Sequence, residues 1–381
     1  MSKRMFAGAS TPVGFVDLFD NILPTSEAQV RLFLKGSSGS GKSTFMKKVA
    51  AEFETLGYEV ERFHCANDAE SLDSIAVSAV GLCIMDATFP HAHDPQITIA
   101  IDKMPDFARF IDEQKLEPYL DELKSLAIAK KVSSKYVDMC LAAIGSFYGL
   151  ENRDFEGVLD AHAVQMLAKK YIDDLSIYIE SGAIGHERKL FLSAITPDGY
   201  VSFADSHFKG CKVYGVSCDM IGVGKSIFLE ELKNLAISYG VNVTSFYNPF
   251  SPEQIEHLYF PEASVAFASV GSFASGLSAS GLSAGRLSAG RRFGYGGKVD
   301  VEVDINACVR KEAVGFISKL SVDCDLFDKM FDNAVNAMYN ARLLHIRTEE
   351  IYASTMNFDG LNAFCEMLIE GLREKVTRLT Y

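Results

Sequence analysis

A glycine-rich stretch, "GSSGSGKST", places a lysine and two hydroxyl residues directly after a run of small residues. Glycines at this spacing let consecutive backbone N–H groups turn inward around phosphate groups, and the start of a following helix adds its positive end. In such a loop Lys42 reaches the β- and γ-phosphates of a nucleotide, and the Ser43 hydroxyl is a ligand of Mg²⁺. We therefore predict a phosphate loop that consists of Gly36, Ser37, Ser38, Gly39, Ser40, Gly41, Lys42, Ser43 and Thr44.

A Mg²⁺ ion at this loop also needs a carboxylate. Asp86 ends the apolar run "VGLCIM", which is the position of the metal-side aspartate in sites of this kind. The next residues are Ala-Thr-Phe-Pro-His, so no glutamate follows Asp86 to activate water. Slow hydrolysis and phosphotransfer therefore stay open as reactions.

Two more residues are candidates for chemistry near the γ-phosphate. Asp68 follows the expected second strand in "FHCANDAE", and His91 follows the third in "PHAHDP". Both loops should open at the carboxyl edge of the sheet, where a proton acceptor could act. An ordinary loop role is the alternative for each residue. A metal site at His91 and His93 is disfavoured because no third ligand stands at suitable spacing.

The chain contains an internal repeat. "MFAGASTPVGFV" matches "LFLSAITPDGYV" at an offset of 185 residues, and "GSGKSTFMKKVAAEFETLGYEVERF" matches "GVGKSIFLEELKNLAISYGVNVTSF" at an offset of 183. Two matches in the same order at nearly one offset indicate a duplication. We expect one half over residues 1–185 and the other over residues 186–381, which contains a Gly/Ser/Ala-rich loop at 275–297.

Each half reads as strand, glycine loop, helix, strand, short helix and strand. This order predicts an α/β fold with two tandem parallel sheets of the phosphate-loop type, covered by helices on both faces. Gly57 and Gly240 stand where a helix ends and a positive φ is needed. Helical sequence follows each sheet, at about 106–184 and 307–378.

The second loop, "SCDMIGVGKSIF", keeps the lysine and serine but differs elsewhere. Asp219 replaces the first glycine, Ile227 replaces Thr44, and Ser269 replaces Asp86. A carboxylate about 5 Å from a phosphate charge costs roughly 3 kcal/mol at an effective dielectric of 20, which is more than a hundredfold in affinity. We expect the first half to hold the functional Mg-ATP site and the second to be a degenerate copy.

The segment of about residues 30–90, with its glycine loop and Asp86, resembles the P-loop NTPases. The whole chain, with "FAGASTPVGF", "FHCANDAESLD" and "FLSAITPDG", resembles a little-characterised bacterial family of tandem P-loop proteins, which are labelled ATPase-like or nucleotide-kinase-like. The resemblance implies ATP as the nucleotide and two similar halves. It does not supply an acceptor substrate.

Composition excludes some classes of function. The net charge of −13 argues against a general nucleic-acid binder, which would need surplus lysine and arginine. We find no apolar run of about 18 residues and expect a cytoplasmic protein without a membrane partner. Two similar halves could also pack against each other as a pseudo-dimer within one chain.

Three functions fit these residues. The first is slow Mg-dependent ATP hydrolysis in the first half. The second is a kinase that transfers the γ-phosphate to an unknown small-molecule, nucleotide or protein acceptor, although Arg109 is the one evident arginine in the segment that would form a lid. The third is a switch that binds ATP without turnover. An arginine from 275–297, such as Arg286, could also be swung toward a bound phosphate.

Overall fold

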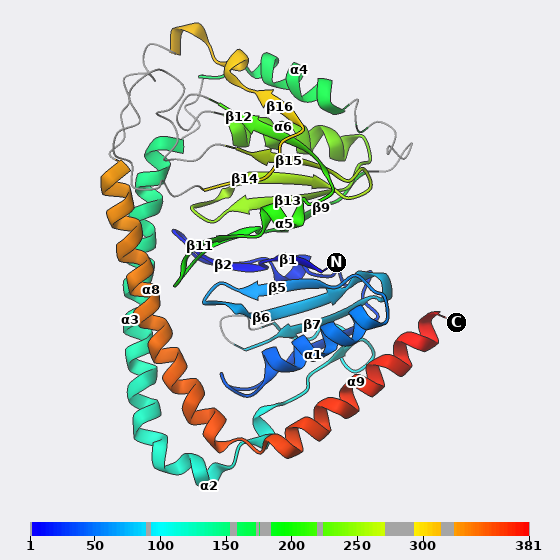
Figure 1. Cartoon of the computed structure of the whole chain (residues 1–381), viewed down its shortest axis with the longest axis vertical. Coiled ribbons are helices and arrows are strands. Elements are labelled where there is room, and N and C mark those ends of the chain that lie inside the picture. The colour runs from blue at the N-terminus through cyan, green and yellow to red at the C-terminus, as the bar shows by residue number, and fades with distance from the viewer. Residues whose placement is uncertain are drawn as a thin grey trace.

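The computed structural model describes residues 2–88, 93–152, 158–172, 175, 184–218, 224–270, 293–313 and 324–380. Two six-stranded sheets lie one above the other, with long helices along one side and across both outer faces (Figure 1). The protein is therefore of mixed α/β class, with two mostly parallel sheets flanked by helices.

In the first sheet, five strands run in one direction and one runs against them. The spatial order is β1 (Lys3–Met5), β5 (Glu61–Cys65), β6 (Asp68–Val77), β7 (Leu82–Asp86), β4 (Val30–Leu34) and β8 (Asp102–Lys103).

The second sheet repeats this order and these directions. Its strands are β9 (Glu187–Leu190), β13 (Val243–Asn248), β14 (Ser251–Phe260), β15 (Val265–Ser269), β12 (Lys212–Ser217) and β16 (Val301–Asp304).

The prediction of a short helix between the second and third strands of each half was wrong. Residues 68–77 and 251–260 instead form the antiparallel strands β6 and β14. Two residues, Ala66 and Asn67, connect β5 to β6, which is enough for an antiparallel hairpin but far too short for a parallel crossover. The last six residues of β6 are all buried, including β-branched Ile75 and Val77, and such residues favour a central strand.

Helix α1 (Lys42–Thr55) follows β4, and helix α6 (Lys225–Ser238) follows β12. Gly57 has φ of 89° and Gly240 has φ of 83°, so the predicted positive-φ residues after these helices are confirmed. Both helices lie on the outer faces of their sheets (Figure 1).

The inner faces of the two sheets share one core. Phe33 and Phe63 from the first half and Phe208 and Phe246 from the second belong to the same buried cluster. The expectation of helices on both faces therefore needs correction: among the described residues the inner layer contains the short helices η1 (Phe19–Asn21) and α5 (Ala204–His207).

The two halves meet symmetrically. Phe6 N donates to Phe191 O at 2.9 Å and Phe191 N donates to Phe6 O at 3.0 Å. Beside this pair lie two hairpins, β2 (Gly8–Thr11) with β3 (Gly14–Asp17), and β10 (Ser193–Thr196) with β11 (Gly199–Ser202). Reciprocal contacts of this kind are those of a two-fold dimer, here formed within one chain.

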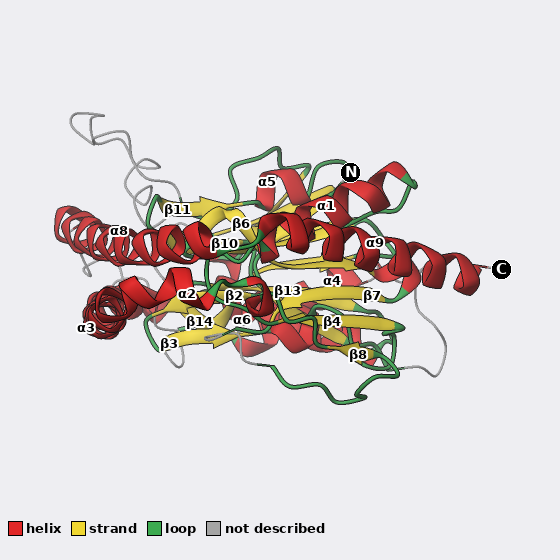
Figure 2. Cartoon of the chain, turned by 90° about the horizontal axis from the view of Figure 1, so that it is seen from below, coloured by secondary structure: helices red, strands yellow, loops and turns green. Residues whose placement is uncertain are grey.

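The helical segments exchange sheets. Helix α3 (Leu120–Asn152) crosses from the first half to the second, where α4 (Ala161–Ile172) packs into the core of the second sheet. Helix α8 (Cys324–Thr355) crosses back, and α9 (Phe358–Thr380) packs on the first sheet beside α1 (Figure 2). Helices α3 and α8 pack along each other. The outer face of each sheet is therefore covered by a helix from the other half: α4 covers the second sheet and α9 covers the first.

Candidate functional site

The predicted phosphate loop connects the end of β4 to the first turn of α1. Gly36, Gly39 and Gly41 have φ of 149°, 77° and 88°, values that side chains with a Cβ rarely adopt. Helix α1 begins at Lys42, so the free N–H groups of its first turn lie at the loop. This geometry explains why the sequence uses three glycines here.

Lys42 turns back over the loop. Its Nζ donates to Gly36 O at 2.6 Å and to Ser37 O at 3.0 Å, and it lies 3.5 Å from Asp86 Oδ2. The side chain is 7% exposed; burial lowers its pKa, and the Asp86 carboxylate partly offsets this effect. The ammonium group is therefore held between the loop carbonyls and an acid, where phosphate oxygens could replace the carbonyls as partners.

Asp86 lies at the end of β7, directly beside Leu34 at the end of β4. Thr88 N donates to Asp86 Oδ1 at 2.8 Å, and Thr88 Oγ1 donates to Gly36 O at 2.9 Å. These bonds fix the carboxylate and tie the segment after β7 to the first glycine of the loop. The structure thus brings together Lys42 and Asp86, which are 44 residues apart in the chain.

The hydroxyl groups of the loop differ in their surroundings. Ser43 Oγ accepts a hydrogen bond from Leu72 N at 3.0 Å, which uses one of its two lone pairs. Ser37 Oγ and Ser40 Oγ are buried without a hydrogen-bond partner among the described residues. Thr44 is exposed. The orphaned hydroxyls, the ammonium of Lys42 and the first turn of α1 together fit a phosphate group, and Ser43 with Asp86 fits Mg²⁺.

Sequence reasoning missed Asp73. Strand β6 pairs Ser74 with Met85 of β7, so Asp73 and Asp86 are the next residues of these two strands beyond that pair. Asp73 is 7% exposed and its charge acts on Lys42. Asp73 could have been found only by predicting β6 as an antiparallel strand, because its pairing with β7 brings Asp73 beside Asp86.

Asp68 lies at the start of β6, in a compact turn. Its carboxylate accepts hydrogen bonds from Ser71 Oγ at 2.7 Å and from Arg342 Nη2 at 3.3 Å. His91 lies outside the described residues, as does Arg286. His93 lies beside Asp17, with 3.0 Å between Nε2 and Oδ2.

Helix α8 of the second half covers the loop, which the sequence did not reveal. Ser38 Oγ lies 3.3 Å from His345 Nε2, and a Cβ at Gly39 would lie 2.6 Å from the backbone oxygen of Glu349. The Glu349 carboxylate acts on Lys42; burial and the nearby Asp68 raise the pKa of Glu349. Two helices of the second half therefore border the site, because Leu361 of α9 also lies 3.1 Å from a Cβ placed at Gly41.

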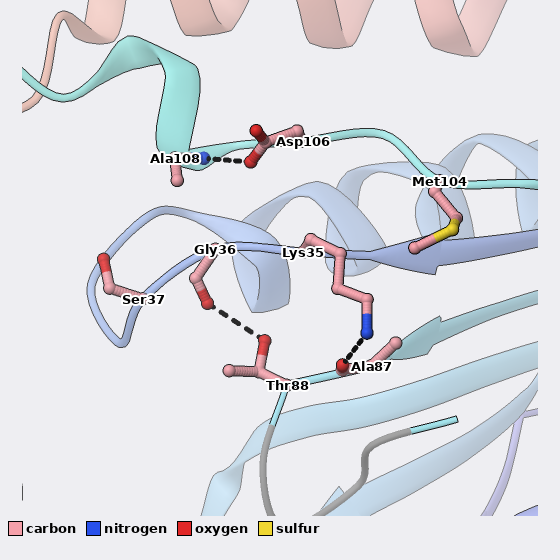
Figure 3. Close-up of a pocket in the computed structure, with 8 residues that line it drawn as sticks. All are labelled: Lys35, Gly36, Ser37, Ala87, Thr88, Met104, Asp106 and Ala108. Carbon is pink, nitrogen blue, oxygen red and sulfur yellow. Dashed lines mark hydrogen bonds between the residues drawn. The ribbon is translucent and has the colours of Figure 1, made fainter. Parts of the chain in front are cut away.

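A hollow of about 620 Å³ opens beside the first glycine of the loop (Figure 3). The Lys35 side chain points across it to Ala87 O, at 2.6 Å, and Thr88 reaches Gly36 on the same side. Its lining residues are Lys35, Gly36, Ser37, Ala87, Thr88, Met104, Asp106 and Ala108.

Residues 219–223 of the second loop, among them Asp219, lie outside the described residues. Lys225 is half-buried, burial lowers its pKa, and its Nζ donates to Val270 O at 3.3 Å. Burial raises the pKa of Glu256, the counterpart of Asp73, to about 7, and its carboxylate accepts hydrogen bonds from Ser193 and Tyr200. A neutral residue, Ser269, ends the strand where Asp86 stands in the first half.

Among the described residues, no group of three or more His, Cys, Asp or Glu side chains is placed so that it could hold a metal ion. None of the described helices is both long enough and apolar enough to cross a membrane. Comparisons with protein-family models, curated proteins and solved structures found no match.

Proposed function

We propose that this protein is a P-loop NTPase that binds Mg-ATP at the phosphate loop of its first half and hydrolyses it slowly. The observation that carries this proposal is the position of Lys42, which lies 3.5 Å from Asp86 at the first turn of α1. A cation, a carboxylate and a helix N-terminus at one sheet edge are what a Mg-nucleotide site needs. The resemblance to tandem P-loop proteins favours ATP over other nucleotides.

Each residue of the proposed site has a role in binding Mg-ATP. Lys42 would contact the β- and γ-phosphates, and the N–H groups of the loop would surround them. Ser43 and Asp86 would hold Mg²⁺, which supplies positive charge against the phosphate oxygens when bound. Asp73 and Glu349 are acids whose charge acts on Lys42, and either could orient a water molecule in place of the glutamate that does not follow Asp86.

The second half would not bind Mg-nucleotide in this way. Ser269 stands in place of Asp86, and the Lys225 ammonium group donates to Val270 O. We propose that this half serves as a scaffold whose helices α8 and α9 complete the first site.

Phosphotransfer is the second candidate, and the hollow beside Gly36 favours it. An acceptor bound there would lie next to Thr88 and Asp106, at the end of the loop. The volume of about 620 Å³ is within the range of small-molecule sites.

Labelled ATP distinguishes these functions. Purified protein is incubated with ATP and Mg²⁺, with and without a metabolite mixture, and both phosphate release and label transfer are followed. Release without acceptor supports hydrolysis, acceptor-dependent transfer supports a kinase, and binding without either reaction supports a switch. Lys42→Ala should abolish ATP binding measured by calorimetry, and Lys225→Ala is the matched control. Loss of binding in Lys225→Ala alone would reverse the assignment of the two halves.

A further inference from the structure

Arg342 of helix α8 lies at the boundary between the two halves. Its Nη2 donates to Asp68 Oδ1 at 3.3 Å in the first half, and its Nη1 donates to Asp198 Oδ2 at 2.9 Å in the second. The Arg342 side chain is 25% exposed, and the side chains of Asp68 and Asp198 are 37% and 58% exposed. Ion pairs this open to water hold their partners weakly, so a more highly charged anion can compete for the arginine.

The arginine is on the helix face that covers the phosphate loop. His345, one turn further along α8, lies 3.3 Å from Ser38, and Glu349 packs its backbone against Gly39. Residues three, four and seven apart lie on one side of a helix, so Arg342, His345 and Glu349 share this side. The charge of Arg342 acts on Glu349, and the charge of Glu349 acts on Lys42, so the arginine is close to the charged groups at the loop.

The charge around the loop calls for another cation. Three carboxylates, Asp86, Glu349 and Asp73, act on Lys42. An ATP γ-phosphate would add negative charge to this acidic surrounding, and a guanidinium group beside Lys42 and Mg²⁺ would balance more of that charge. Arginine suits this task because its planar fork of donors matches phosphate oxygens.

The second half offers an internal comparison. Gly145 of α3 packs against Pro12 in the first hairpin, as Arg342 of α8 meets Asp198 next to Pro197 in the second. The counterpart of Asp68 by the offset of 183 is Ser251, and the counterpart of Asp198 by the offset of 185 is Val13. Both acids that pair with Arg342 are therefore replaced by uncharged residues at the corresponding positions of the repeat.

From these contacts we propose that Arg342 is a catalytic residue of the first-half site: it leaves Asp68 and binds the γ-phosphate of ATP. This inference rests on the proposed function. It assigns to the second half a direct part in the reaction, because an arginine from α8 would stabilise charge on the transferred phosphoryl group. It also links the nucleotide to α8, because the arginine exchanges its partner when ATP replaces ADP.

The test compares Arg342→Ala with the wild type and with Arg347→Ala. Arg347 is on the same helix and pairs with Glu122 and Glu350. Its substitution is a matched control, because it also removes one ion-paired arginine from α8. We expect Arg342→Ala to lower kcat at least about 100-fold and to weaken a non-hydrolysable ATP analogue about tenfold or more, with ADP affinity within about twofold. Arg347→Ala should keep kcat and both affinities within about twofold.

A purely structural clamp would give a different pattern. In that case Asp198→Asn, which breaks the other ion pair of Arg342, would impair the protein as much as Arg342→Ala. Our proposal predicts that Asp198→Asn retains kcat. Equal weakening of ATP analogue and ADP by Arg342→Ala, or an unchanged kcat, would overturn the role of Arg342 and leave the proposed function intact. A wild-type protein that binds no ATP would overturn both.

Discussion

Ending the chain at Met356 removes helix α9 and should unfold the first sheet, although α9 follows the second sheet in sequence. Leu361, Cys365, Leu372 and Val376 are each at most 5% exposed and belong to the core of the first half. Burial of an aliphatic side chain contributes about 1.5 to 3 kcal/mol, so Leu361, Leu372 and Val376 together contribute roughly 5 to 9 kcal/mol. Domains are stable by about 5 to 15 kcal/mol, and the loss is comparable to that total.

Hydrogen exchange of the truncated and full-length proteins measures this directly. Amides of β4 and β7 should lose protection, and those of β12 and β15 in the second sheet should keep most of theirs. Leu372→Ala is a milder version, expected to lower the free energy of unfolding by about 3 kcal/mol. Met367→Ala is its control on the same helix, because Met367 is 61% exposed. Protection that persists in β4 but disappears from β12 would contradict the exchange of helices.

Two further substitutions test the loop and a buried acid. Gly39→Ala should destabilise the protein by more than 2 kcal/mol, since its Cβ would lie 2.6 Å from Glu349 O, whereas Gly57→Ala, at φ of 89° with nothing within 4 Å, should cost about 1 kcal/mol; thermal unfolding of both variants checks this. Glu256 has a pKa of about 7 in the fold against 4.5 ordinarily, so the folded protein holds the extra proton and stability should fall as pH rises from 4.5 to 7, by roughly 3 kcal/mol. Urea unfolding at pH 5 and pH 8 should show this fall in the wild type and lose it in Glu256→Gln; the same fall in both proteins would assign it to another group.

The glycine loop before α1 could be predicted from sequence because its requirements are local. The glycines and the lysine lie within seven residues of one another, and in the structure they connect β4 to the first turn of α1, as expected from the sequence. Asp86 could be placed because it ends an apolar strand, which is again a local pattern. The positive φ of Gly57 and Gly240 followed from the helix pattern in the same way.

Strand β6 was predicted as a short helix because the pattern of its ten residues is compatible with either a helix or a strand. The choice depends on pairing with β5 and β7, which bury the last six residues of β6 between them. Asp73 was missed for the same reason, because its position beside Asp86 depends on the antiparallel register of β6 and β7 and not on a sequence motif.

The amino-acid sequence was sufficient for the internal repeat, the glycine loop before α1, and the replacement of Asp86 by a serine in the second half, since each depends on residues that are neighbours in the chain or on a constant offset. Tertiary packing alone decided which helices border the glycine loop of the first half. Helices α3 and α8 are long enough to cross between the sheets, and nothing in their residue patterns says which sheet α4 and α9 will cover. The choice of sheet is decided by burial of the two outer faces against α4 and α9. This packing brings Glu349 of the second half to the loop of the first, and Arg342 to Asp68.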